Sequence, residues 1–149
     1  MKKLVLLITI FLLTGCFYSK PQKFYLDNKY YNKGEYINLK KEELEKLNNE
    51  SMVVYTYNNF CNLPIHCETI FKEFMEKYKI DFISIPFAEL KDIKLFKEIS
   101  FAPSIILINN GKIITYLKSD LDKDYDKYQS VQQFEKWLGE YIYFNKATN

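Results

Sequence analysis

Arginine is absent from this chain of 149 residues, so lysine alone supplies all 21 basic side chains. Without guanidinium groups the protein cannot make the bidentate contacts that dominate base-specific and phosphate-binding sites. The lysines are also interspersed with 19 acidic residues, which leaves no basic field to attract a polyanion. The composition therefore argues against nucleic acid as a partner.

Glycine and proline are scarce, at four residues each, and no repeat of fixed period is visible. A low-complexity chain, a solenoid and a propeller are thereby excluded. Apolar residues make up 48% of the chain, which is enough for a packed core. The length suits one domain with a short additional segment.

Long apolar runs are also missing, apart from one at the N-terminus. Residues 1–3 (Met-Lys-Lys) are followed by the apolar run Leu4 to Leu13, which only Thr9 interrupts. Ten residues are too few to span a bilayer but are typical of the apolar region of a secretory signal. Leu13, Thr14, Gly15 and Cys16 follow directly.

These four residues resemble the lipobox of bacterial lipoproteins. The resemblance implies that residues 1–15 are a lipoprotein signal peptide and that Cys16 begins the mature chain and carries diacylglycerol. Its acyl chains, palmitate among them, would anchor the protein to the cell membrane on the extracytoplasmic face, where disulfides persist. A plain signal peptide with an incidental cysteine, or a short buried strand, is the alternative.

Residues 16–35 are predicted to contain the lipidated cysteine and a tether. The segment has lysines, asparagines, Pro21 and Gly34, without the periodicity of a helix or a strand. Its tyrosines can lie at a membrane interface, as amphipathic rings do, or pack on the surface of the domain, and the second placement is favoured. They are Tyr18, Tyr25, Tyr30 and Tyr31.

Residues 36–149 are predicted to form one α/β domain. Alternating strands and helices favour parallel pairing with helices on both faces of a sheet. Asn110 and Gly111 predict a tight hairpin turn, because both residues tolerate a positive φ. The predicted elements are strand 36–39, helix 40–48, strand 52–57, helix 67–79, strand 82–87, helix 89–99, strand 104–108, strand 112–117 and helix 131–144.

Two segments resemble the thioredoxin family. The strand at 52–57 leads into Cys61, where the family has its redox motif, and residues 99–112 resemble the family's stretch from its cis-proline to an Asn-Gly hairpin. The resemblance implies a thioredoxin-like fold: a central mixed sheet with helices on both faces, a C-terminal β-hairpin and a helix. It also implies that Cys61 is the nucleophile, that Cys67 is its resolving partner, and that Pro103 is a cis-proline beside them.

The chain departs from the family at three positions. The family's motif has two residues between its cysteines, whereas five residues separate Cys61 from Cys67. Phe60 stands where the family has a tryptophan, and Tyr55 stands where many members have a buried acid. The fold is therefore a safer expectation than the activity.

The wider spacing places a physical condition on the cysteine pair. In one continuous helix, residues six apart are separated by roughly 9 Å along the axis, whereas a disulfide needs Cα atoms within about 7 Å. Proline is tolerated in the first turn of a helix, so we expect the helix to start near Pro64, with Cys61 in a loop that folds back toward Cys67. The helix N-terminus and the adjacent His66 would both stabilise a thiolate.

These features predict a thiol–disulfide oxidoreductase without cofactor or bound metal, acting on the thiols and disulfides of exported or cell-envelope proteins. The main alternative is a non-enzymatic lipoprotein, an accessory or binding factor for export, in which Cys61 and Cys67 form a structural disulfide. Copper transfer is a third interpretation, weakened because His66 is the only histidine. His66 itself can equally be an ordinary polar surface residue.

Residues 119–130 alternate acidic and other side chains. They lack the glycine and glutamate that a calcium-binding loop requires, and are predicted to be a solvated, charged loop.

Overall fold

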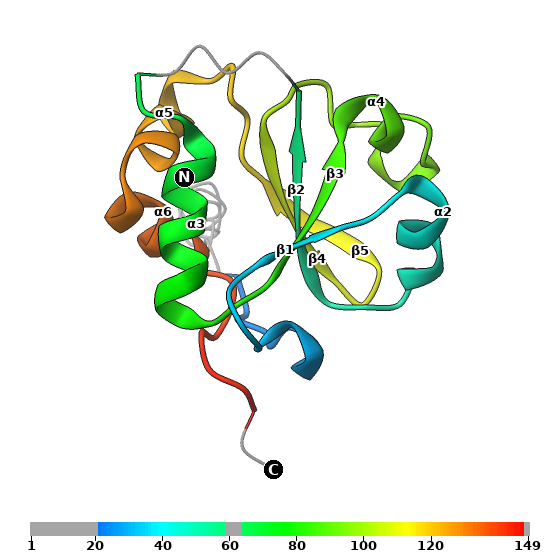
Figure 1. The fold of residues 1–149 in the computed structure, drawn as a ribbon, viewed down its shortest axis with the longest axis horizontal. Helices are drawn as coiled ribbons and strands as arrows, with labels where there is room; N and C mark the ends of the chain where they lie inside the picture. Colours follow the sequence, from blue (N-terminus) through cyan, green and yellow to red (C-terminus); the bar gives the residue numbers. More distant parts are fainter. Residues whose placement is uncertain (1–20, 59–63, 148–149) are drawn as a thin grey trace, which may run out of the picture.

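The computed structural model describes residues 21–58 and 64–147. Its centre is a five-stranded mixed sheet in the order β1-β3-β2-β4-β5 (Figure 1). The first three strands in this order pair in parallel, whereas β4 is antiparallel to both β2 and β5. The strands are β1 Tyr36–Asn38, β2 Met52–Tyr57, β3 Phe82–Pro86, β4 Ser104–Asn109 and β5 Lys112–Tyr116.

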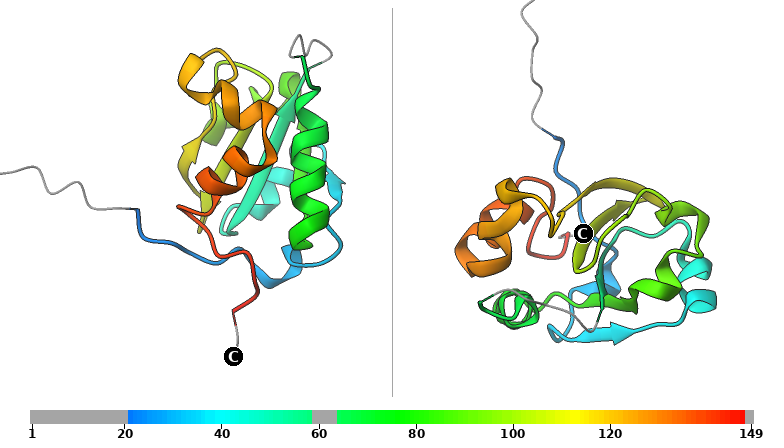
Figure 2. Two further views of the ribbon diagram at one scale, coloured as in Figure 1. Left: turned by 90° about the vertical axis from the view of Figure 1, so that its left-hand side faces the viewer. Right: turned by 90° about the horizontal axis from the view of Figure 1, so that it is seen from above.

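Helices cover both faces of the sheet, as predicted. The helices α3, α5 and α6 lie together on one face, and α2 and α4 lie on the other (Figures 1 and 2). The α-helices are α2 Lys41–Leu44, α3 Cys67–Tyr78, α4 Phe87–Leu90, α5 Asp122–Gln129 and α6 Val131–Leu138; the 3-10 helices are η1 Asn28–Tyr30, η2 Glu45–Leu47 and η3 Lys94–Phe96.

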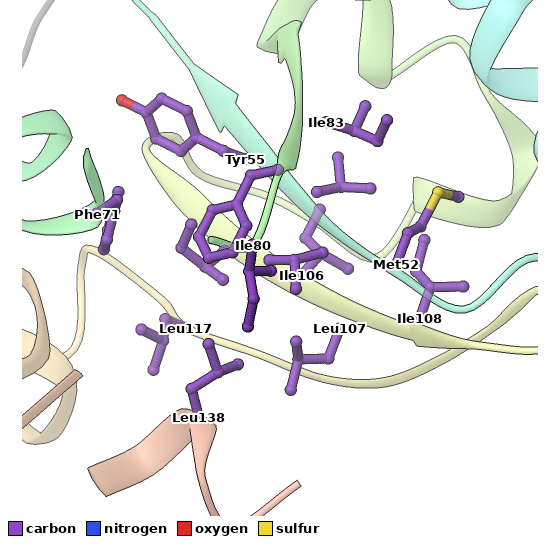
Figure 3. Packing of buried hydrophobic residues seen from close by; sticks show 14 of the residues in the cluster. Met52, Tyr55, Phe71, Ile80, Ile83, Ile106, Leu107, Ile108, Leu117 and Leu138 are labelled. Atoms are coloured by element: carbon purple, nitrogen blue, oxygen red, sulfur yellow. The ribbon is translucent and has the colours of Figure 1, made fainter. Parts of the chain in front are cut away.

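The central strand β2 and its neighbour β4 are buried along almost their whole length. Strands covered on both faces need apolar side chains throughout, which explains their continuous hydrophobic runs. Met52, Ile106 and Ile108 belong to the packing that Figure 3 shows. Between β4 and β5, Asn110 (φ 48°) and Gly111 (φ 71°) form the predicted tight turn.

The single helix predicted over residues 89–99 is wrong. The chain forms α4 and η3 instead, with Ile93 extended between them. The buried residues Leu90, Ile93, Phe96 and Ile99 recur every three positions, and three backbone hydrogen bonds join each of them to the next. A spacing of three is the period of 3-10 turns, whereas an α-helix has 3.6 residues per turn.

The helix predicted over residues 131–144 also ends early, at Leu138. The chain after α6 pairs with the N-terminal segment: Phe24 donates its N–H to the carbonyl of Tyr141 and accepts from the N–H of Tyr143. These backbone bonds bring both ends of the described chain to one end of the molecule, here called the terminal end (Figure 2).

Much of the segment predicted as a tether belongs to the packed domain. Leu26, Tyr30 and Tyr31 are buried, which confirms the placement of these two tyrosines against the domain, and Asp81 accepts hydrogen bonds from the backbone N–H groups of residues 33, 34 and 35. The domain therefore begins near Phe24 and not at residue 36. The sequence of this segment has no helical or strand periodicity, so its burial could not be predicted from a hydrophobic pattern. Tyr18 and Cys16 lie outside the described residues.

The loop predicted over residues 119–130 is likewise wrong, because it contains the helix α5. Asp124 and Tyr128 are buried, and the Asp124 carboxylate accepts from the backbone of Lys118 and from the ammonium of Lys127. Neutralised in this way, an acidic side chain can occupy the inner face of a helix. None of the helices described here is long and apolar enough to cross a membrane.

Candidate active site

Cys67 is the first residue of α3, at the opposite end of the molecule from the two ends of the described chain (Figure 1). Its side chain is fully buried. A helix N-terminus carries partial positive charge, which favours the thiolate over the thiol. Cys61, Asn62 and Phe60 lie outside the described residues. We call the region around Cys67, with the loops that meet it, the Cys67 end.

Tyr55, on β2, points its hydroxyl at Cys67. The Tyr55 oxygen lies 3.9 Å from the Cys67 sulfur, and Tyr55 is only 4% exposed. The hydroxyl points away from the aliphatic side chains of the core (Figure 3). Burial, together with the neighbouring Cys67, raises the pKa of Tyr55 far above its usual range. The hydroxyl therefore stays protonated and can donate to a thiolate on Cys67.

Aromatic rings fix the position of the Tyr55 side chain. Its ring lies 5.4 Å from that of Tyr36 and 5.4 Å from that of Phe71, the latter edge-on. Contacts of this kind stabilise a defined ring orientation. Beside them opens a polar cleft of about 420 Å³, lined in part by Tyr57, His66 and Ser84.

His66 precedes α3 and is largely exposed. It occupies the N-cap position in an extended conformation, without a side-chain bond to the helix, and its Nδ1 lies 3.9 Å from a carboxylate oxygen of Glu68. A protonated His66 is thus placed to pair with Glu68. A tuning of the cysteines by His66 stays a prediction.

Pro64 is exposed and lies before α3, so the helix start predicted near Pro64 is wrong. The next residue explains the later start. Gln129, at the end of α5, accepts from the N–H of Ile65 at 3.0 Å and donates to its carbonyl at 2.9 Å. These two bonds hold Ile65 in the segment before the helix, and the backbone hydrogen bond at the start of α3 runs instead from the Thr69 N–H to the His66 carbonyl.

Pro103 follows a cis peptide bond, as the resemblance implied, and is buried. Three side chains fasten its loop. The Tyr128 hydroxyl lies 3.1 Å from the Pro103 carbonyl, the Asn58 amide donates to the Ala102 carbonyl, and the Ser104 hydroxyl donates to the Phe101 carbonyl. The loop is thereby tied to both β2 and α5.

Tyr128 also links this loop to α3, because its ring lies 5.7 Å from that of Phe71, one turn after Cys67. Burial raises the pKa of Tyr128 well above its usual range, and the neighbouring Cys67 adds to this rise. The structure therefore brings together Cys67, Pro103, Tyr55 and Tyr128 at one end of the sheet. A thiolate that forms there meets the neutral hydroxyl of Tyr55, whereas the Tyr128 hydroxyl is directed at the carbonyls of Pro103 and Leu117.

Two contributors, Tyr128 and Gln129, were missed by sequence reasoning because their segment was interpreted as a loop. Leu121, Asp124 and Tyr128 recur at spacings of three and four, which is the signal of a helix face that could have found them. Within residues 21–58 and 64–147, no three histidine, cysteine, aspartate or glutamate side chains are grouped as a metal ion would require.

Among the comparisons with known proteins, only the comparison with solved structures found matches. No family model matches the chain, and no curated protein does. A mutant thioredoxin from Halobacterium salinarum is 14% identical with a TM-score of 0.51, over 78% of this chain and 97% of its own. Thioredoxin NaTrxh from Nicotiana alata is 18% identical with a TM-score of 0.50, over 71% of this chain and 91% of its own.

These likenesses show that the chain has a thioredoxin-like fold of the α/β class. The reduced thioredoxin of Schistosoma mansoni is 27% identical to this chain, with a TM-score of 0.49, over 72% of this chain and 99% of its own. The fold places Cys67 and Pro103 at one end of the sheet, and the chemistry of that end rests on the residues themselves.

Proposed function

We propose that this protein is a membrane-anchored, extracytoplasmic thiol–disulfide oxidoreductase that uses Cys61 and Cys67. The observation that carries the proposal is the position of Cys67: it opens α3, in contact with the Tyr55 hydroxyl. Tyr128 packs against Phe71 of the same helix and binds the carbonyl of Pro103 in the cis-proline loop. The N-terminus of the helix and the hydroxyl donor both favour the thiolate form of Cys67, and a thiolate is the attacking species in disulfide exchange.

The burial of Cys67 supports the proposed roles within the pair. A fully buried sulfur cannot reach a substrate disulfide, so Cys61 makes the first attack. Its thiolate forms a mixed disulfide and releases one substrate thiolate. The Cys67 thiolate then attacks the Cys61 sulfur, closes the Cys61–Cys67 disulfide and releases the second substrate thiolate. Two electrons pass to the substrate, and the reverse sequence oxidises a substrate dithiol.

The proposed location follows from the N-terminal sequence. A signal peptide over residues 1–15 and a diacylglycerol on Cys16 would hold the domain on the extracytoplasmic face of the cell membrane. Its substrates would then be thiols and disulfides of exported or cell-envelope proteins. Mass spectrometry of protein extracted from membranes tests this: acylated Cys16 at the N-terminus is expected, and a retained Met1 would contradict it.

The same burial favours a second candidate. A disulfide between Cys61 and a fully buried Cys67 is also what a structural staple would look like. In that case the protein is a non-enzymatic binding factor with a thioredoxin-like fold.

A redox titration separates the two candidates. The mature protein is equilibrated in poised thiol–disulfide buffers and alkylated, and the Cys61 and Cys67 peptides are weighed. A reversible two-electron transition between about −120 and −270 mV is expected for a catalytic pair. A bond that stays closed below about −300 mV would show a staple and end the enzyme proposal. A Cys61→Ser variant, which has no pair to titrate, is the matched control.

A further inference from the structure

The terminal end carries a small aromatic surface beside the point where the N-terminal segment joins the domain. Tyr25 and Tyr143 are 43% and 42% exposed, and their rings stack with centroids 4.4 Å apart. The Lys23 ammonium lies over the Tyr143 ring, at 5.8 Å from its centroid, and Lys146 is exposed nearby in sequence. We call these four residues the terminal face.

Exposed tyrosines next to lysines are suited to the boundary between lipid and water. The ring of tyrosine enters the apolar boundary while its hydroxyl and a neighbouring ammonium stay hydrated. The same two segments also contain the acidic residues Asp27 and Glu140, so they are not purely basic. Any attachment here therefore depends on the aromatic rings and not on net positive charge.

The length of chain before the domain limits how far this face can lie from an anchor. Phe24, the first residue bonded to the C-terminal segment, stands eight positions after Cys16. Fully extended, these eight steps span at most about 28 Å. An anchor on Cys16 thus keeps the domain within about 28 Å of the membrane surface, and the contacts of the terminal face have to set its orientation.

Helix α3 sets the distance between this face and the Cys67 end. The helix runs from Cys67 to Tyr78, whose ring lies 4.4 Å from that of Phe144 at the terminal end. Eleven steps along an α-helix correspond to about 16 Å. Figure 1 shows the two ends of α3 at opposite ends of the molecule.

From these observations we propose that the terminal face rests on the lipid surface and orients the domain with its Cys67 end away from the bilayer. This inference rests on the proposed anchoring at Cys16. The cysteine pair then meets thiols of proteins in the aqueous space outside the membrane, and not thiols at the level of the lipid headgroups.

Photocrosslinking from lipid tests the orientation on the unaltered protein. Lipidated full-length mature protein is reconstituted in vesicles of phosphatidylcholine and phosphatidylglycerol that contain a phospholipid with a diazirine near its headgroup. After irradiation, labelled peptides are quantified by mass spectrometry. We expect severalfold more label on the peptide with Tyr143 than on the peptide with Phe101, an aromatic residue of similar exposure, 49%, at the Cys67 end.

A double variant, Tyr25→Ser with Tyr143→Ser, separates the rings from the anchor. It should keep its fold, because both side chains are exposed, and should lose most of the preference for the terminal end. A Phe101→Ser variant should leave the labelling of the terminal face unchanged. Equal labelling of the Tyr143 and Phe101 peptides, or an unchanged preference in the double variant, would overturn the inference.

The same samples keep this inference apart from the proposed function. The mass of the N-terminal peptide reports the lipid on Cys16, and an unmodified Cys16 would overturn both the anchoring and the orientation. The redox titration of Cys61 and Cys67 does not depend on orientation. A catalytic potential with uniform labelling would therefore refute the orientation alone.

Discussion

The Cys67 end and the terminal end of this protein differ in the contacts that hold their outer segments. At the terminal end, aromatic rings pack against one another: Phe74 contacts Phe82, Phe134 and Phe144. At the Cys67 end, single side chains bind backbone groups of neighbouring loops, as Gln129 does with Ile65 and Tyr128 with Pro103. Aromatic packing also reaches the Cys67 end, where Phe71 contacts Tyr55 and Tyr128, but the outer loops of that end are held by single polar side chains.

Because of this difference, we expect substitutions at the terminal end to change the stability of the fold, and substitutions at the Cys67 end to change the chemistry of the cysteine. Burial of a large aromatic side chain contributes several kcal/mol, whereas a hydrogen bond contributes about 1 kcal/mol net. Substitutions at the terminal end should therefore act on the whole fold. Substitutions at the Cys67 end should leave the domain folded while they change the environment of the sulfur.

The largest effect is expected for Phe74→Ala. Phe74 is fully buried, so its truncation should lower the free energy of unfolding by about 3–5 kcal/mol, a large part of the stability of a typical domain. Denaturant titration followed by the fluorescence of Trp137 measures the loss.

Phe101→Ala is the matched control at the Cys67 end. Phe101 is 49% exposed, so the same change of side chain should alter stability by less than about 1 kcal/mol. Equal losses of unfolding free energy in the two variants would contradict the difference between the two ends, because they would show that the Cys67 end contributes as much to the stability of the fold.

Most of the fold could be predicted from sequence, because its strands and α3 have clear periodicity. The continuous apolar runs of β2 and β4 and the Asn110-Gly111 turn are of this kind. Apart from α5, whose helical spacing was overlooked, the errors fall where burial does not follow an α-helical or strand period. Asp81 holds residues 33–35 through backbone contacts, and no hydrophobic pattern encodes such a bond.

The candidate site was predictable in part for a similar reason. Cys67 and Pro103 could be predicted as site residues, because cysteine and proline are the residue types on which the resemblance to the family rests. Tyr55 was noted only as a departure from the family, and its contact with Cys67 depends on the register between β2 and the start of α3. Gln129 was missed because its partner is a backbone group, which carries no sequence signal of its own.

A Tyr55→Phe substitution tests the chemistry of the Cys67 end. The ring contacts remain, so stability should change by only about 1 kcal/mol. Loss of the hydroxyl donor should make the Cys67 thiolate less favourable. In a Cys61→Ser background, the pH midpoint of Cys67 alkylation by a small reagent should therefore move upward. Burial raises the pKa of the Tyr55 hydroxyl, so its own titration does not enter the measured range.

Tyr57→Phe is the control for this substitution. Tyr57 is on the same strand, and its ring lies 5.9 Å from that of Tyr55. It should leave the alkylation midpoint in place. A midpoint that does not move in the Tyr55 variant would show that the contact with Cys67 is packing alone.

The smallest effect is expected for Gln129→Ala, which removes both hydrogen bonds to Ile65. These bonds are exposed, so water can replace them, and the free energy of unfolding should fall by only about 0.5–1 kcal/mol. Local opening should respond more strongly, because Gln129 is what joins α5 to the segment before α3. Hydrogen exchange at the Ile65 amide, measured by NMR, should accelerate.

Two further variants sharpen this last test. Gln129→Glu should give an intermediate exchange rate, since a carboxylate can still accept from the Ile65 N–H but cannot donate to its carbonyl. Gln133→Ala, at an exposed glutamine on α6, should change neither stability nor exchange. If Ile65 exchanges at the same rate in all three variants, the loop before Cys67 is ordered by other contacts, and polar side chains do not fix this end of the molecule.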